Sequence, residues 1–153
     1  MKRLFYIFVI IFFKFNTANS LIEVDITRGN LDPLPIAISP LHVDVQSESY
    51  KDLKVKELGE LISSVIEENF RSTGLFNPLN KDAFVQKPDI ANLKPRFEDW
   101  RLITAQALVT GKISIKDNKL KVEFRLWDLA AAQEMLALAF TTTPSNWRRV
   151  AHI

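Results

Sequence analysis

The clearest hydrophobic pattern of the chain lies between residues 50 and 73. Apolar side chains recur there at spacings of three and four, separated by lysine and glutamate, which is typical of a helix with one buried face. Gly74 follows, where a residue in the left-handed conformation commonly ends a helix. The pattern therefore predicts an amphipathic helix over residues 50–73. Its expected core positions are Val55, Leu58, Leu61, Ile62, Val65, Ile66 and Phe70.

Shorter segments surround this helix. Residues 35–45 form an apolar run typical of a buried strand, in which Pro40 requires a bulge or an edge position. Residues 75–84 predict a short strand and a turn, and residues 86–95, with two prolines, predict a surface loop. Residues 96–105 predict a short helix. The residues expected on one face of that helix are Phe97, Trp100 and Ile103.

Residues 107–129 consist of two alternating runs around Asp117 and Asn118, which tolerate the positive φ angles of a two-residue hairpin turn. Closing the hairpin there places apolar residues opposite one another on one face, and a slip by one residue would destroy this match. Lys112 and Glu123 would add an attraction between opposite charges. The expected pairs are Lys116 with Lys119, Ile115 with Leu120, Ile113 with Val122, Val109 with Leu126, Lys112 with Glu123 and Gly111 with Phe124.

A third strand is expected over residues 134–142, with Leu136, Leu138 and Phe140 on one face. The turn before it, residues 130–133, lacks the glycine, asparagine or aspartate usual in turns. The order of elements predicts an α/β (α+β) fold, in which two helices pack on one face of a mixed sheet.

The chain ends with a short helical pattern. Ser145 or Asn146 is the expected N-cap, and Trp147, Val150 and Ala151 start an apolar stripe. Two turns are too few for a helix to persist without a packed face. We therefore expect this helix to be unfinished and an apolar patch beside it to be uncovered.

Residues 1–20 have the composition of an export signal. Lys2 and Arg3 precede an apolar run of roughly ten residues, and small residues lead to an expected cleavage site between Ser20 and Leu21. The run is shorter than the roughly 20 residues of a membrane span, and Lys14 interrupts it. A cleaved signal peptide is the preferred interpretation. An uncleaved membrane anchor is the alternative.

Removal of the signal changes the charge of the chain. The sequence has 20 basic and 18 acidic residues, and residues 1–20 contain three of the basic ones and no acid. The remainder is therefore slightly acidic, which argues against nucleic-acid binding because neutralising phosphates requires a net basic face. The lack of cysteine excludes disulfide and thiol chemistry.

Few residues suggest catalysis. His42 lies in an apolar run and His152 near the end of the chain, so two separate histidines are favoured over a shared metal site. The adjacent acidic pairs at residues 67–68 and 98–99 lie in helices, where neighbouring side chains diverge into solvent. The four glycines cannot form a phosphate-binding loop. We predict no enzyme activity, no catalytic residue, no metal and no cofactor.

Two features allow more than one interpretation. Trp127 falls on the polar face of the hairpin beside Arg125, where it either marks a contact surface or, as we favour, is covered by a helix. Residues 22–26 alternate between apolar and polar side chains. They are the first strand of the domain's own sheet, a flexible tail, or an arm that adds a strand to a partner's sheet. The residues alone leave these alternatives open.

Five stretches together resemble a known family. They are residues 23–38 (EVDITRGNLDPLPIAI), 71–79 (RSTGLFNPL), 100–113 (WRLITAQALVTGKI), 121–128 (KVEFRLWD) and 146–153 (NWRRVAHI). None is a catalytic signature, but the set has the family's order and spacing and spans the chain after residue 20. The family is the amino-terminal domain of TolB, the periplasmic component of the Tol–Pal system of Gram-negative bacteria.

The resemblance implies a mixed sheet with two helices, similar to anticodon-binding domains of some tRNA synthetases. It also implies a non-enzymatic periplasmic protein that supports outer-membrane integrity and envelope invagination during cell division, in a system that colicins and phages exploit for entry. In the family an amino-terminal arm binds the C-terminal domain of TolA. This implies the same role for Ile22, Glu23, Val24, Asp25, Ile26, Thr27, Arg28 and Gly29.

Family members also carry a β-propeller that binds the lipoprotein Pal. These 153 residues contain no blade repeat, so we expect a fragment of such a protein without Pal binding. The expected division is a signal peptide at residues 1–20, an arm at 21–34 and a domain at 35–153. A small-ligand-binding periplasmic domain is the remaining alternative.

Overall fold

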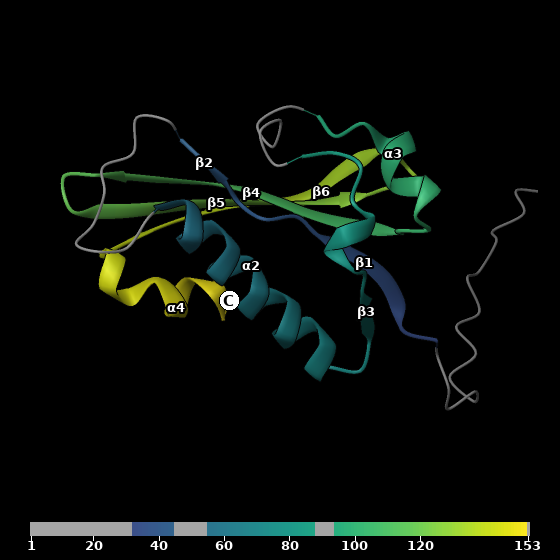
Figure 1. The fold of residues 1–153 in the computed structure, drawn as a ribbon, viewed down its shortest axis with the longest axis horizontal. Coiled ribbons are helices and arrows are strands. Elements are labelled where there is room, and N and C mark those ends of the chain that lie inside the picture. Colours follow the sequence, from purple (N-terminus) through teal and green to yellow (C-terminus); the bar gives the residue numbers. More distant parts are fainter. Residues whose placement is uncertain (1–31, 45–54, 88–93, 153) are drawn as a thin grey trace, which may run out of the picture. The chain divides into compact units, whose positions relative to one another are not determined.

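The computed structural model describes residues 32–44, 55–87 and 94–152, which belong to one compact unit (Figure 1). Within these residues, three α-helices pack against one six-stranded mixed sheet, which confirms the expected fold class. A strand over residues 22–26 lies outside the described residues. The elements are β1 (Leu34–Ile38), β2 (His42–Val43), α2 (Val55–Ser72), β3 (Phe76–Pro78), α3 (Phe97–Leu102), β4 (Ala107–Lys116), β5 (Lys119–Asp128), β6 (Gln133–Thr142) and α4 (Trp147–Ala151), with 3₁₀ turns at Lys81–Ala83 and Pro144–Asn146.

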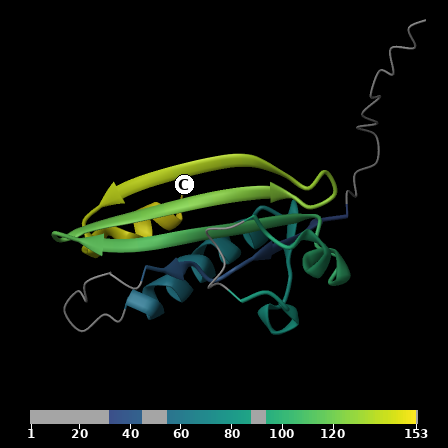
Figure 2. The ribbon, with the colours of Figure 1, turned by 90° about the horizontal axis from the view of Figure 1, so that it is seen from above.

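The sheet has the strand order β3-β1-β4-β5-β6, and β2 also pairs with β4. β1 runs parallel to both β3 and β4, whereas β4, β5 and β6 form an antiparallel meander (Figure 2). β3 and β6 are therefore the two outer strands of this order, and β4 lies between the two halves of the sheet.

The predicted break at Pro40 is present. β1 and β2 pair with successive parts of the same strand, since Ile36 lies opposite Ala107 and His42 opposite Lys112. Proline has no N–H group to donate to a strand ladder, so the pairing stops there. Leu41, which follows, turns its side chain into the core and is 3% exposed.

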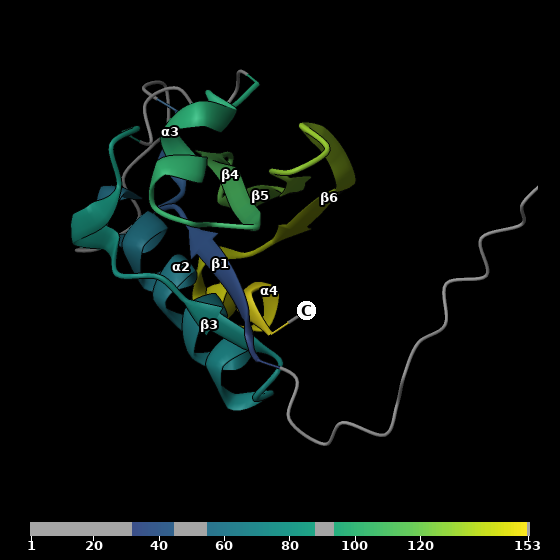
Figure 3. The same ribbon diagram turned by 90° about the vertical axis from the view of Figure 1, so that its right-hand side faces the viewer.

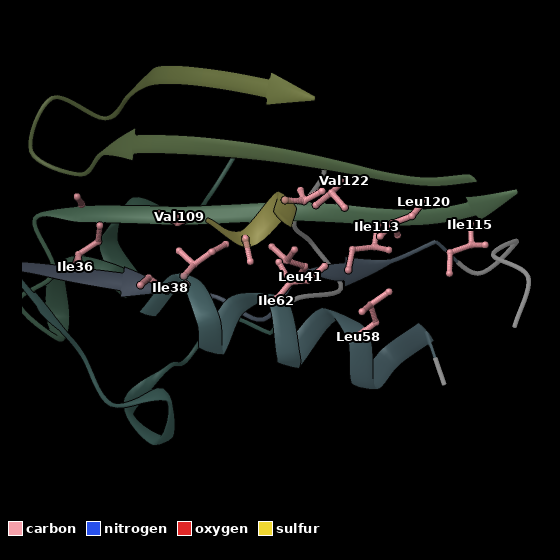
Figure 4. Packing of buried hydrophobic residues seen from close by; sticks show 14 residues of the cluster. Ile36, Ile38, Leu41, Leu58, Ile62, Val109, Ile113, Ile115, Leu120 and Val122 are labelled. Atoms are coloured by element: carbon pink, nitrogen blue, oxygen red, sulfur yellow. The ribbon is translucent and has the colours of Figure 1, made fainter. Parts of the chain in front are cut away.

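One face of the sheet is covered by α2 and α4. The apolar residues of α2 meet those of β1, β4 and β5 in the larger core (Figure 4), to which Val150 and Ala151 of α4 also belong. α2 ends as predicted, because Gly74 has a φ angle of +70° and its N–H donates to the carbonyl oxygen of Arg71.

The opposite face is covered by α3, so the expectation that all helices lie on one face is wrong (Figure 3). Phe97 and Trp100 pack there against Leu108 and Trp127 in a second, smaller core. The physical reason is visible in β4, where residues 107–111 are buried without alternation. A strand end that is apolar on both faces needs a covering layer on each side.

The hairpin register is confirmed at every expected pair from Lys116–Lys119 to Val109–Leu126. Asp117 and Asn118 have φ angles of 50° and 56°, as a two-residue hairpin turn requires. The expected ion pair is different, however. Lys112 contacts the carboxylate of Asp44 at 3.0 Å, and Glu123 contacts Lys121 on its own strand at 2.9 Å. Partners that are not directly opposite therefore satisfy both charges.

β6 forms as predicted but is exposed along most of its length. A bulge at Met135 changes its register, so that Leu126 lies opposite Leu136 and Trp127 opposite Glu134. The turn before β6 forms without the glycine, asparagine or aspartate that usually adopts its positive φ angle. Ala132 adopts a φ angle of 54°, and the Asp128 side chain accepts a hydrogen bond from the backbone N–H of Ala131 at 2.8 Å.

The expectation of a surface loop over residues 86–95 is wrong at both ends. Gln86 is 7% exposed and Pro95 is buried. The Gln86 Oε1 atom accepts hydrogen bonds from the indole N–H of Trp100 at 3.0 Å and from the backbone N–H of Arg96 at 3.1 Å. These bonds fix the start of α3 against the second core.

Candidate interaction surfaces

The residues assigned to partner binding, Ile22 to Gly29, and the cleavage site at Ser20 and Leu21 lie outside the described residues. The structure shows where the chain after them enters the fold. Leu34 is the first residue of β1 and lies opposite Phe76 of β3. Its backbone N–H donates to the carbonyl oxygen of Leu75 at 2.9 Å. Among the residues that the structure describes, the sheet therefore begins at Leu34.

Trp127 is not a contact surface. It is 6% exposed, its ring centroid lies 6.0 Å from that of Phe97 on α3, and its indole N–H donates to Thr110 Oγ1 at 3.0 Å. The favoured alternative, that a helix covers this face of the hairpin, is confirmed.

The acidic pair at residues 67–68 does not diverge. Glu67 and Glu68 both bind the guanidinium of Arg71, at 2.7 and 2.9 Å, and Glu67 also lies 3.1 Å from Lys81 Nζ. Burial alone would raise the pKa of Glu67. The hydrogen bonds and positive charges of Arg71 and Lys81 outweigh that effect and lower this pKa below its ordinary value. Partly exposed groups of this kind form a surface ion-pair network that contributes to stability.

The histidines lie in different elements, His42 in β2 and His152 after α4. The side-chain nitrogen of Asn69 on α2 lies 3.1 Å from His152 Nδ1 and donates to the carbonyl oxygen of Ala151 at 2.9 Å. In the part of the chain that the structure describes, no three His, Cys, Asp or Glu side chains gather as metal ligands would. None of the described helices combines the length and the apolar character needed to cross a membrane.

An apolar groove of about 130 Å³ lies between the end of α4, the second half of α2 and the β5–β6 hairpin. Its open side is formed by Leu136 and Leu138 of β6, which are 48% and 39% exposed. We call it the α4 groove. The residues that line it are Ile66, Phe70, Val109, Phe124, Arg125, Leu126, Leu136, Leu138, Phe140, Val150 and Ala151.

The lining of the α4 groove suits packing rather than chemistry. Its one charged residue, Arg125, places its guanidinium 2.6 Å from the carboxylate of Glu134. Apolar side chains are therefore what the groove can bind. The sequence predicted an uncovered apolar patch beside the last helix. The residues expected to be uncovered were those of the helix itself, but Val150 is buried, and the exposed apolar residues are Leu136 and Leu138 of β6. The signal lay in β6, whose apolar residues meet mainly the short α4 among the helices of the described residues.

Comparisons with known proteins agree with the observed fold and identify the family of the chain. Residues 22–135 match the family model described as the TolB amino-terminal domain. The Tol–Pal system protein TolB of Pelagibacter ubique (strain HTCC1062) is 64% identical over 155 aligned residues. The alignment covers 100% of this chain and 34% of that protein, so the chain spans about a third of the length of this relative.

Solved structures share the fold at low sequence identity. TolB from Acinetobacter baumannii matches with a TM-score of 0.54 and 20% identity, over 78% of this chain and 26% of that one. The LpoB C-terminal domain from Salmonella enterica matches with a TM-score of 0.52 and 9% identity, over 76% and 87% of the two chains. The structural likeness speaks for the fold alone, whereas the family model covers most of the sequence. The chain belongs to the TolB amino-terminal domain family.

Proposed function

We propose that the chain is a non-enzymatic interaction module of the Tol–Pal system that works in the periplasm after removal of residues 1–20. The observation that carries the proposal is the family match, which begins at residue 22, one residue beyond the amino terminus expected after cleavage. The apolar lining of the α4 groove also supports a binding role rather than a reaction. In this role the module would support outer-membrane integrity and envelope invagination during division.

The proposed binding segment is the arm, residues 21–34, with Ile22 to Gly29 contacting the C-terminal domain of TolA. Apolar and polar residues alternate along Ile22–Thr27, which suits addition of a strand to a partner's sheet, because backbone hydrogen bonds then give affinity and alternate side chains meet the partner. The proposed contact residues, Ile22 to Gly29, precede β1, the first strand of the described residues, which begins at Leu34, so they would bind without removing β1 from the domain. Residues 35–153 form the domain that carries it.

Calorimetric titration of the TolA C-terminal domain with the full chain and with a peptide of residues 22–32 tests this proposal. We expect both to bind weakly. Replacing Ile22, Val24 and Ile26 together by serine should abolish binding. The matched change of Glu23, Asp25 and Thr27 to alanine should preserve most of it, because that row faces away from the partner's core.

A chain that lacks residues 21–31 is used in the second part of the experiment. It should lose TolA binding and keep its melting temperature within about 2 °C. No binding at millimolar peptide would contradict the assignment of the arm. A deletion that unfolds the domain would instead identify residues 22–26 as a strand of its own sheet. Mass spectrometry of the exported protein should show the loss of residues 1–20, and Pal should not bind these 153 residues.

A further inference from the structure

The two outer strands of the sheet differ in how they are protected. β3 has three residues and ends in Pro78, which has no N–H to donate to another strand. Short length, proline and lysine are the usual devices that keep an outer strand from pairing with another chain. β6 has none of them. It extends over ten residues, and its one charged side chain, Glu134, binds Arg125 of the neighbouring strand.

The unprotected side of β6 presents a row of backbone groups. Among the described residues β6 pairs with β5 alone (Figure 2), and we call its side that faces away from β5 the β6 edge. Alternate residues of an antiparallel strand direct their N–H and C=O groups to the same neighbour. Lys116 and Lys119, which close the hairpin turn, direct theirs to each other. Counted from there through the register, the residues that direct theirs to the β6 edge are Ala137, Ala139 and Thr141.

We propose that the β6 edge binds the β6 edge of a second copy of this chain, antiparallel, with the two-fold axis at Leu138. In that register Leu138 lies opposite its own equivalent, and Leu136 lies opposite the partner's Phe140. These side chains are on the face of the sheet that carries the α4 groove. Three apolar pairs therefore form, and they cover Leu136 and Leu138, which are exposed in the single chain.

The charges on the other face of the sheet select the same register. Ala137 lies opposite Arg125 of β5, and Ala139 lies opposite Glu123. With Leu138 on the axis, Ala137 faces the partner's Ala139. One row across the four strands then has Arg125 at one end and the partner's Glu123 at the other, separated by two small side chains. Complementary charges of this kind favour one orientation and one register.

The neighbouring registers lack this match. An axis at Ala139 places two copies of Glu123 at the ends of one row, and an axis at Ala137 does the same with two copies of Arg125. Like charges in such rows disfavour both arrangements. A contact around a two-fold axis must present the same surface twice and be complementary to itself. β6 meets this condition with Leu138 on the axis, which is why we name a second copy as the occupant.

A single introduced cysteine tests the register, because the chain has no cysteine of its own. In the chain of residues 21–153, Leu138→Cys places two thiols across the axis, where the Cα separation suits a disulfide. Mild oxidation at about 100 µM protein should crosslink most molecules as dimers. Thr141→Cys is the control on the same strand. Its equivalent lies six residues further along, roughly 20 Å away, so it should stay monomeric.

Sedimentation of the unmodified chain measures the affinity. One pair of strands is a small contact, so we expect a monomer–dimer equilibrium with a Kd on the order of 10–100 µM. Species larger than a dimer should be absent, because each copy has one β6 edge to contribute. Ala139→Pro should weaken the dimer at least about tenfold, because it removes an N–H that faces the partner and not β5. Its melting temperature shows whether the variant is folded.

A charge exchange provides a second test that leaves the backbone intact. Glu123→Lys places a positive charge in the row of the partner's Arg125 and should weaken the dimer several-fold at low salt. Adding Arg125→Glu to the same chain restores opposite charges in each row. The double variant should therefore recover most of the lost affinity.

Three results would overturn the proposal. They are a chain that stays monomeric at about 500 µM, equal crosslinking of the Leu138→Cys and Thr141→Cys variants, and a folded Ala139→Pro variant that dimerises as before. Dimerisation by a chain that lacks residues 21–31, but not by the longer chain, would overturn it too, since the arm would then occupy the β6 edge. The TolA titration is a separate measurement, so failure of the proposed arm function would leave these results unaffected.

Discussion

A Cβ atom placed on Gly59 of α2 would lie 2.6 Å from the carbonyl oxygen of Leu41. The helix therefore crosses the break between β1 and β2 in backbone contact, with no room for a side chain at this point. The Leu41 N–H also points to the carbonyl oxygen of Gly59, at 3.4 Å.

Gly59→Ala should consequently lower the free energy of unfolding by about 1–3 kcal/mol, because either the helix or the break must shift. At an unconstrained helix position the same change would stabilise by about 1 kcal/mol. Urea denaturation measures whether the free energy of unfolding falls or rises. Ser64→Ala, at an exposed site on the same helix, is the control and should change stability by less than about 0.5 kcal/mol. A more stable Gly59→Ala protein would show that α2 does not approach Leu41 this closely.

Trp127 and Thr110 should behave as a coupled buried pair. Trp127→Phe leaves the Thr110 hydroxyl without its indole partner, and Thr110→Val leaves the indole N–H without an acceptor. Each single change should cost about 1–3 kcal/mol. The double variant should cost less than the sum, because it removes both polar groups. Additive losses within about 0.3 kcal/mol would mean that the two side chains do not interact.

The ion pairs of Glu67 should make stability depend on pH. Because the pKa of Glu67 is lowered in the folded state, its contribution is present above the ordinary value of 4.5 and is lost as the pH falls through the folded pKa. Glu67→Gln should cost about 0.5 kcal/mol at neutral pH and low salt. This difference should shrink below pH 4.5 and with added salt. Glu68→Gln, which removes only the more exposed contact, should cost less at every pH.

Ala132→Gly should stabilise the protein by about 0.5 kcal/mol. Ala132 adopts a φ angle of 54°, a conformation that strains a residue with a Cβ atom by about 1–2 kcal/mol, and the greater freedom of glycine in the unfolded chain offsets part of the gain. Ala131→Gly is the matched control and should destabilise, because it adds that freedom without relieving strain. Thermal unfolding compares the two. A loss of stability in Ala132→Gly would indicate that its methyl group packs more tightly than its partial burial suggests.

Local chemistry explains which features the sequence predicted. Asp117 and Asn118 specify a turn by themselves, and the turn together with the alternation on each side determined the register of β4 and β5. Gly74 likewise ended α2 where expected. In these cases each residue needs only its near neighbours to decide its conformation.

Features that depend on distant segments were missed. Nothing near Lys112 in the sequence shows that it would form an ion pair with Asp44, which directly follows β2. Gln86 is polar and follows a turn, so its burial becomes visible only once Trp100 is placed beside it. The side of the sheet on which α3 lies is explained by the burial of residues 107–111 without alternation, which only the structure shows. The α4 groove is likewise a product of five elements, α2, β4, β5, β6 and α4, brought together.

The position of β4 has a consequence for the order in which the chain acquires its structure. β4, β5 and β6 are neighbours in sequence and can associate quickly through short loops, whereas β1 must find β4 across most of the domain. During synthesis, β3 can pair with one edge of β1 early, but the other edge of β1 and the whole of β2 lack their partner until β4 is complete at residue 116. That interval is when this chain is most exposed to misassociation.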